Sequence, residues 1–121
     1  MFKKPIPDTN MLVEVRGDGF LVEVDMKGTW VAVEDVERVA VVTTSQGPFL
    51  PDAFFVLDLV DGRRLVVDQE DPASQSLLVL MQDALPGFDN GAFIAAMSFV
   101  EDAVFVVWEK TAFRTGGGRA A

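Results

Sequence analysis

Alternation of apolar and polar side chains over two neighbouring segments constrains the fold of this chain most strongly. Residues 11–16 (MLVEVR) and 20–26 (FLVEVDM) both follow a period of two, which is typical of half-buried β-strands. Asp18-Gly19 between them favours a two-residue type I′ turn, whereas a three-residue loop over 17–19 would mix the two faces. We therefore predict an antiparallel hairpin with one wholly apolar face. Its predicted cross-strand pairs are Val15 with Val22, Val13 with Val24, and Met11 with Met26.

Further strands follow this hairpin. Lys27-Gly28 is predicted to form the next turn, and Glu34-Asp35 to bend the chain. Segment 53–60 is apolar on both faces, which indicates a central strand, and Asp61-Gly62 repeats the hairpin signal. The expected strands after the first hairpin are 30–33, 38–44, 53–60 and 64–68, with a loop over 45–52.

After residue 70 the apolar period changes to that of a helix. Asp71 is expected to cap this helix and Pro72 to occupy its first position. The expected buried stripe consists of Leu77, Leu80, Met81, Ala84 and Leu85.

The stretch LPGFDN (85–90) is predicted to be a corner between two helices. Pro86-Gly87 ends the first helix, and Asp89 caps the second. Phe88 and Phe93 then have the spacing of a hydrophobic staple. A last strand over 103–109, apolar on both faces up to Trp108, is expected inside the sheet.

Together these signals predict an α+β fold. We expect a bent antiparallel sheet of about six or seven strands built from hairpins, two consecutive helices packed on one face, and a final strand. The expected organisation is an N-terminal extension over 1–10, a single domain over 11–110, and a disordered C-terminal tail over 111–121.

Charge restricts the partners of the chain. It has 19 acidic and 10 basic residues, a net charge of −9, and the balance over residues 8–109 is 5 − 19 = −14. Such a field repels phosphate backbones and anionic membranes and attracts a basic protein. No targeting segment is visible, and the longest apolar run, 103–108, is too short for a membrane span. We therefore expect a soluble, cytoplasmic protein that binds neither nucleic acid nor membrane.

The absence of several residue types argues against catalysis. The chain has no histidine, cysteine or tyrosine, so the commonest general base, the thiol nucleophile and the usual zinc ligands are missing. We expect no cofactor and no enzymatic activity. Two acidic clusters could chelate a hard cation through carboxylate oxygens, although solvated turns and helix capping explain both more simply. They are Glu34, Asp35 and Glu37, and Asp68, Glu70 and Asp71.

One loop stands out as a candidate partner-binding site. In GPFLPD, Pro48 and Pro51 stiffen a segment that presents Phe49 and Leu50. These side chains either cover the open end of the core or form an exposed anchor for a partner. The side chains of Trp30 and Trp108 could also have either of two roles. They could pack in the core, which we favour, or line a pocket.

Three sequence motifs carry a resemblance. W-x-x-x-E-D-V-x-x-V, T-T-x-x-G-P-F-x-x-D-x-F-F-x-L and L-P-G-F-D-N-x-x-F-x-x-A-M run from Trp30 to Met97. This combination resembles a family of small, uncharacterised bacterial proteins, which implies no activity and no catalytic residues. The hairpins and the following helix also look like a pleckstrin-homology-type roll, from which the second helix and the final strand depart.

We therefore expect a non-enzymatic protein-interaction domain. One alternative is an acidic immunity-type protein that neutralises a basic toxin, and a second is a carboxylate-based metal-dependent enzyme. The sequence also allows the chain to form a homo-oligomer.

Overall fold

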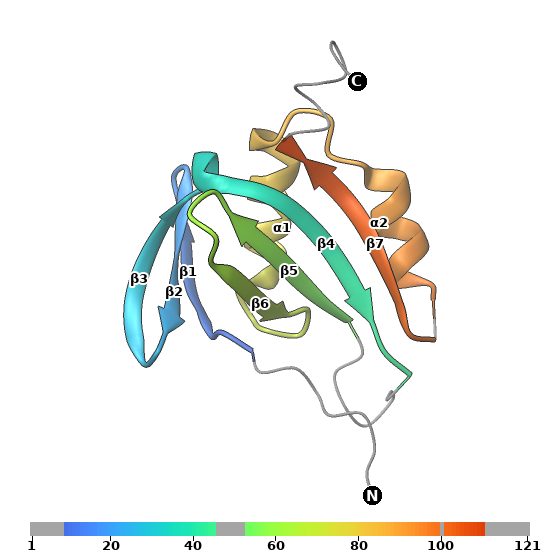
Figure 1. Ribbon diagram of the computed structural model, residues 1–121, viewed down its shortest axis with the longest axis horizontal. Coiled ribbons are helices and arrows are strands. Elements are labelled where there is room, and N and C mark those ends of the chain that lie inside the picture. Colours follow the sequence, from blue (N-terminus) through green and yellow to red (C-terminus); the bar gives the residue numbers. More distant parts are fainter. Residues whose placement is uncertain (1–8, 46–52, 100, 111–121) are drawn as a thin grey trace, which may run out of the picture.

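The computed structural model describes residues 9–45, 53–99 and 101–110. In this part of the chain, seven antiparallel strands and two α-helices form an α+β fold (Figure 1), as predicted. The elements in chain order are β1 (Leu12–Arg16), β2 (Gly19–Val24), β3 (Lys27–Ala32), η1 (Val33–Asp35), β4 (Val36–Thr43), β5 (Ala53–Leu59), β6 (Arg64–Asp68), α1 (Ser74–Ala84), α2 (Asn90–Met97) and β7 (Ala103–Glu109).

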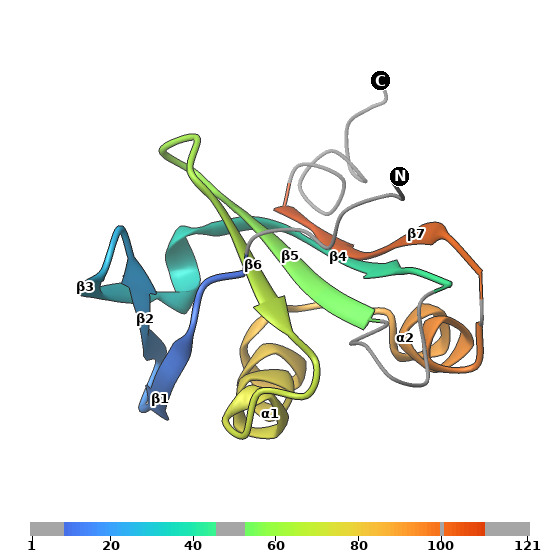
Figure 2. The same ribbon diagram turned by 90° about the horizontal axis from the view of Figure 1, so that it is seen from below.

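The strands form two sheets. The first has the order β1-β2-β3 and the second the order β6-β5-β4-β7. The bend expected at Glu34-Asp35 is the 3₁₀ turn η1, which connects one sheet to the other. Figure 2 shows α1 and α2 on the same face of the four-stranded sheet. The predicted helix pair on one face is thereby confirmed.

The register of the first hairpin differs from the prediction. Its turn is Gly17-Asp18, with Gly17 at φ 63°, and Arg16 pairs with Gly19. A bulge between Leu12 and Glu14 then shifts the pairing further along the strand. This register places Leu12 (3% exposed) and Phe20 (0%) in the core. Burial of these two large side chains outweighs the strict alternation on which the predicted register was based.

The second turn also differs from the prediction. It consists of Asp25-Met26, both with positive φ (52° and 68°), whereas Gly28 lies inside β3 opposite Glu23. Two consecutive residues of positive φ define a type I′ turn, a conformation that asparagine and glycine adopt far more readily than methionine.

The β5–β6 hairpin lies where Asp61-Gly62 predicted it, but its loop has three residues. The amide of Leu59 donates to the carbonyl of Arg63, and Gly62 has φ 95°. This corresponds to a type I turn closed by a residue in the left-handed region. The central position predicted for β5 is confirmed, since β6 and β4 flank it.

Helix α1 begins later than predicted, and Asp71 does not cap it. The residue before the helix is Ala73, which makes no side-chain cap. Asp71 Oδ1 accepts from the amide of Ala73, while Oδ2 accepts from the amide of Leu12 at 3.0 Å. The carboxylate therefore ties the turn before α1 to β1 instead of capping the helix.

The buried stripe of α1 agrees with the prediction only in part. Three of its five predicted residues (Leu77, Met81 and Leu85) are buried, Leu80 is half-buried, and Ala84 is exposed.

The LPGFDN corner is confirmed. Asp89 caps α2 by accepting from the amide of Ala92 at 2.9 Å, and Gly87 has φ 81°. Phe88 is buried. Trp108 Nε1 donates to the carbonyl of Pro86 at 2.7 Å, so the corner is tied to β7.

Strand β7 was predicted inside the sheet but lies at its edge. It pairs with β4, whose other neighbour is β5. Val104 and Val106 consequently remain 62% and 39% exposed. An apolar pattern on both faces does not distinguish a central strand from an edge strand with an uncovered face.

One continuous hydrophobic cluster includes residues of both sheets and both helices. Phe20 of β2, Leu57 of β5, and Leu77 and Met81 of α1 are completely buried in it. Phe93 of α2 packs at its border and stacks on Phe55, with ring centroids 6.0 Å apart. This shared core holds the two sheets in a fixed relation.

Candidate functional site

The residues predicted from sequence as candidate sites are distributed over the fold. The loop of Pro48, Phe49, Leu50 and Pro51 lies outside the described residues. Trp108 is 6% exposed and belongs to the core, as favoured from sequence. Core packing was the wrong expectation for Trp30, which is 45% exposed, with the guanidinium of Arg16 5.6 Å from its ring centroid.

The two acidic clusters have different surroundings. Glu34, Asp35 and Glu37 are exposed at the η1 bend. The cluster of Asp68, Glu70 and Asp71, in contrast, lines a groove between the two sheets. Within the described ranges, no three carboxylates lie close enough together to hold a metal ion.

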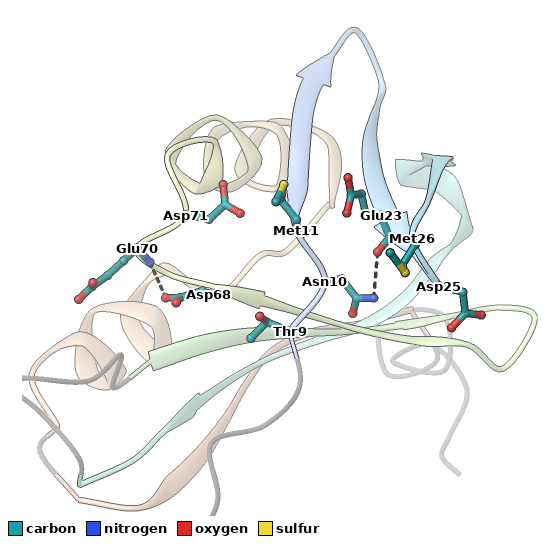
Figure 3. A pocket seen from close by; sticks show the side chains of 9 residues that line it. All are labelled: Thr9, Asn10, Met11, Glu23, Asp25, Met26, Asp68, Glu70 and Asp71. Atoms are coloured by element: carbon teal, nitrogen blue, oxygen red, sulfur yellow. Dashed lines mark hydrogen bonds between the residues drawn. The ribbon is translucent and has the colours of Figure 1, made fainter.

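This groove is an open hollow of about 810 Å³. Figure 3 shows its two walls, one at the end of β6 and the turn before α1, the other on β2 and the β2–β3 turn. The segment 9–11 runs between the walls. The lining residues are Thr9, Asn10, Met11, Glu23, Asp25, Met26, Asp68, Glu70 and Asp71.

Asn10 holds the two walls together. Its backbone amide donates to the carbonyl of Val66, and its Oδ1 accepts from the amide of the same residue at 2.9 Å. Its Nδ2 donates to the carbonyl of Glu23 at 3.1 Å. One side chain thus bridges β6 of one sheet and β2 of the other, which fixes the width of the groove at this point.

The groove is strongly acidic. Five of the nine described residues that line it are carboxylates, and none of these nine is basic. Asp68 accepts from the amide of Glu70, and Asp71 makes the two backbone contacts described above. For the carboxylates of Glu23, Asp25 and Glu70, the described part of the chain contains no hydrogen-bond or ion-pair partner. These three charges are available to a ligand.

Two methionines add apolar surface to the same groove. Met11 is 58% exposed and Met26 is 93% exposed. Met26 also has φ 68°, a conformation that costs a bulky residue free energy and that glycine adopts without strain. A residue that is both strained and almost fully exposed contributes nothing to the core, which makes Met26 a candidate contact residue.

The arrangement of these side chains suits binding. The carboxylates are spread along the groove rather than gathered around one point, so a ligand with several separated positive charges fits better than a single ion. Flexible methionine side chains can adapt to the apolar parts of such a ligand.

Sequence reasoning missed this groove. From sequence, Glu23 and Asp25 are only polar positions of a hairpin. The cluster of Asp68, Glu70 and Asp71 is predicted to serve a turn and a helix cap, with chelation of a hard cation as the alternative.

A second, smaller hollow of about 320 Å³ lies beside the LPGFDN corner, between Pro86, Gly87 and Asp89 and residues 106–109. Its polar groups already have roles in the fold. Asp89 caps α2, and Trp108 bonds to Pro86. We therefore regard the groove between the sheets as the better candidate site.

Comparison with known proteins gives no relative, since no family model, curated protein or solved structure matches this chain. Neither helix of the described chain has the length and apolar character needed to cross a membrane.

Proposed function

We propose that this protein is a non-enzymatic binding domain that holds a basic, extended segment of another protein in the groove between its two sheets. The observation that carries the proposal is the composition of the groove. Among the described residues, five carboxylates and two exposed methionines line it, and none of these lining side chains is basic.

Lysine and arginine side chains match this composition. Each has an apolar stem and a cationic head, so the stem can contact Met11 or Met26 while the head reaches Glu23, Asp25 or Glu70. Complementary charge accelerates association and selects against acidic partners. The net charge of −9 supports the same choice of partner over a longer range.

A synthetic peptide of alternating lysine and leucine is a suitable probe. The triple variant Glu23→Gln, Asp25→Asn, Glu70→Gln removes the three available charges of the groove and retains their shapes. The matched control, Glu34→Gln, Asp35→Asn, Glu37→Gln, makes the same change of net charge at the exposed η1 bend. Binding of the peptide is measured by calorimetry at two salt concentrations.

We expect the groove variant to bind the probe at least roughly tenfold more weakly, which corresponds to about 1.4 kcal/mol. The control variant should stay close to wild type, and added salt should weaken wild-type binding because exposed charges are screened. Equal losses in both variants would mean that only net charge matters, and the groove would then have no special role.

A narrower form of this function is an immunity-type protein whose partner is a basic toxin. The large acidic excess favours it, since such a partner must be recognised quickly. A basic nuclease encoded next to this protein, and inhibited by it in a salt-sensitive way, would support this form. Binding to the lysine–leucine probe does not depend on that result.

A further inference from the structure

Strand β7 leaves one edge of the four-stranded sheet without the protection seen at the other sheet edges. At the β6 edge, Asn10 bonds to Val66. The β1 edge has a bulge and the charged residues Glu14 and Arg16, and β3 starts with Lys27. Bulges, charges and covering segments are the usual means by which proteins block edge pairing. In β7, residues 103–108 contain no charge, proline or glycine.

The described structure covers only the end of this edge. The amide of Asp89 in the LPGFDN corner donates to the carbonyl of Val107, where the pairing with β4 has a bulge. For residues 103–106, no backbone hydrogen bond beyond the pairing with β4 exists within the described ranges. An unpaired strand edge of this kind can accept another strand.

The surroundings of this edge are apolar and nearly uncharged. From residue 90 to residue 108, only Glu101 and Asp102 carry charge. Of the eleven large apolar side chains that are exposed among the described residues, five lie on α2, β7 and the segment between them. They are Ile94, Met97, Phe99, Val104 and Val106.

We propose that a second copy of this chain pairs with it through β7. Two β7 strands would run antiparallel about a two-fold axis and join the two four-stranded sheets into one continuous sheet. Such an interface uses the same surface on both subunits, which is the commonest arrangement in homo-oligomers. If the axis passes near Val104, the Val104 side chains of the two copies lie opposite each other.

Charge identifies a second copy as the occupant. Two chains that each carry −9 repel each other over most of their surfaces and can meet closely only where charge is absent. The β7 edge and α2 supply such a surface. An antiparallel pair also separates the two Glu101-Asp102 turns to opposite ends of the interface. A basic partner would gain nothing here, in contrast to the groove.

The proposed interface is independent of the groove. The groove lies beside β6, and β6 and β7 are the two opposite edges of the same sheet. A dimer formed through β7 would therefore leave both grooves accessible, and loss of one property should leave the other intact.

Cysteine cross-linking tests the pairing directly, because the chain has no cysteine of its own. Full-length Val104→Cys is compared with Val79→Cys, whose site on α1 is also apolar and 48% exposed. Under mild oxidation at micromolar concentration, we expect a disulfide-linked dimer for the β7 variant and about the background level for the α1 variant. Equal cross-linking of both variants would reflect random collision and would overturn the proposal.

Sedimentation equilibrium supplies the second measurement. Wild type and Val79→Lys should both dimerise. Val104→Lys should raise the concentration at the midpoint of dimerisation by roughly tenfold or more, because it places an unpaired charge in an apolar interface. Unchanged circular dichroism would show that the variant remains folded. If the wild type stays monomeric at about 100 μM, well above the dissociation constants usual for specific contacts, the proposal is contradicted.

Hydrogen exchange distinguishes a second copy from a segment of the same chain. If a second copy covers β7, protection of the amides of residues 103–106 should increase with protein concentration. Strong protection that is independent of concentration would identify an intramolecular cover and would overturn the proposal.

Discussion

Gly19 makes the close contact between β2 and β3 possible. A Cβ atom at this position would overlap the ring of Trp30 and would lie 2.6 Å from the carbonyl oxygen of Val31. The exposed tryptophan therefore packs over the backbone of a glycine. Trp30 also receives the guanidinium of Arg16 on its ring, so that three residues of the first sheet form one small surface cluster.

We expect Gly19→Ala to destabilise the protein by about 1–3 kcal/mol, the usual range for an overpacked site. The matched variant is Gly28→Ala, also in the first sheet, where an added Cβ would come no closer than 3.7 Å to Leu21. That change should be tolerated. Urea unfolding gives the free energy of unfolding of both variants. If Gly19→Ala is as stable as wild type, Trp30 does not pack against this glycine.

We expect Met26 to lower the stability of the protein and to strengthen binding of the peptide. Met26→Gly should raise the free energy of unfolding by about 0.5–1 kcal/mol, because glycine adopts positive φ without strain and the lost side chain is 93% exposed. The same variant should bind the lysine–leucine peptide more weakly. Met26→Ala retains the backbone strain, so it should lose binding without gaining stability. Unchanged peptide binding in both variants would remove Met26 from the site.

At the scale of elements, a charged ladder crosses the outer face of the four-stranded sheet. Arg64 of β6 contacts Asp58 of β5 at 2.6 Å, and Arg38 of β4 lies 3.6 Å from the same carboxylate. Arg38 also lies 3.2 Å from Glu109 of β7. This ladder connects all four strands.

The ladder lowers the pKa of Asp58 below its ordinary value of 3.8, chiefly through the hydrogen bond from Arg64, with burial acting in the opposite direction. Because the pKa of Asp58 is lower in the folded state than in the unfolded chain, its ionised carboxylate stabilises the fold. This stabilisation is fully present above about pH 4. This contribution is lost as the pH falls through the folded-state pKa. The effect should be modest, because exposed charges are screened by solvent.

Replacement of Arg64 tests the role of the ladder. In Arg64→Gln, the pKa of Asp58 should move back towards 3.8, as followed by carboxyl NMR titration, and less stability should be lost between pH 4 and pH 2. Asp58→Asn should remove this part of the acid sensitivity altogether. An Asp58 titration that is identical in wild type and Arg64→Gln would exclude the ladder as its cause.

Predictability also differs between elements. The order of strands and helices could be predicted because each has a local signal, such as the alternation that ends at Val24 or the cap at Asp89. The first hairpin register could not, because burial of Phe20 and Leu12 determines it through a bulge. The edge position of β7 could not be predicted either, since it depends on which strand pairs with β4.

At the scale of the whole molecule, the groove results from contacts between distant parts of the chain. Asn10 and Val66 are 56 residues apart in sequence, and Leu12 and Asp71 are 59 apart. These bonds bring Glu23 and Asp25 to face Asp68 and Glu70 (Figure 3). The acidic composition was evident from the sequence, but its concentration in one groove depends on how the two sheets are joined.

The different surfaces of the molecule have different chemical character. The groove beside β6 is acidic, and the β7 edge is apolar and nearly uncharged. These properties suit two different partners, a basic segment in the groove and a second copy at the edge. Both surfaces can be used together, because they lie at opposite sides of one sheet.

Amide chemical-shift mapping on the full-length chain tests the proposed groove most directly. The lysine–leucine peptide is titrated into labelled protein, and the residues whose amide signals move are identified. We predict that the largest changes occur at residues 9–11, 23–26 and 68–71, and that they disappear in the groove triple variant. Changes centred on the η1 bend or on residues 94–106, with the groove unaffected, would contradict the proposed binding site.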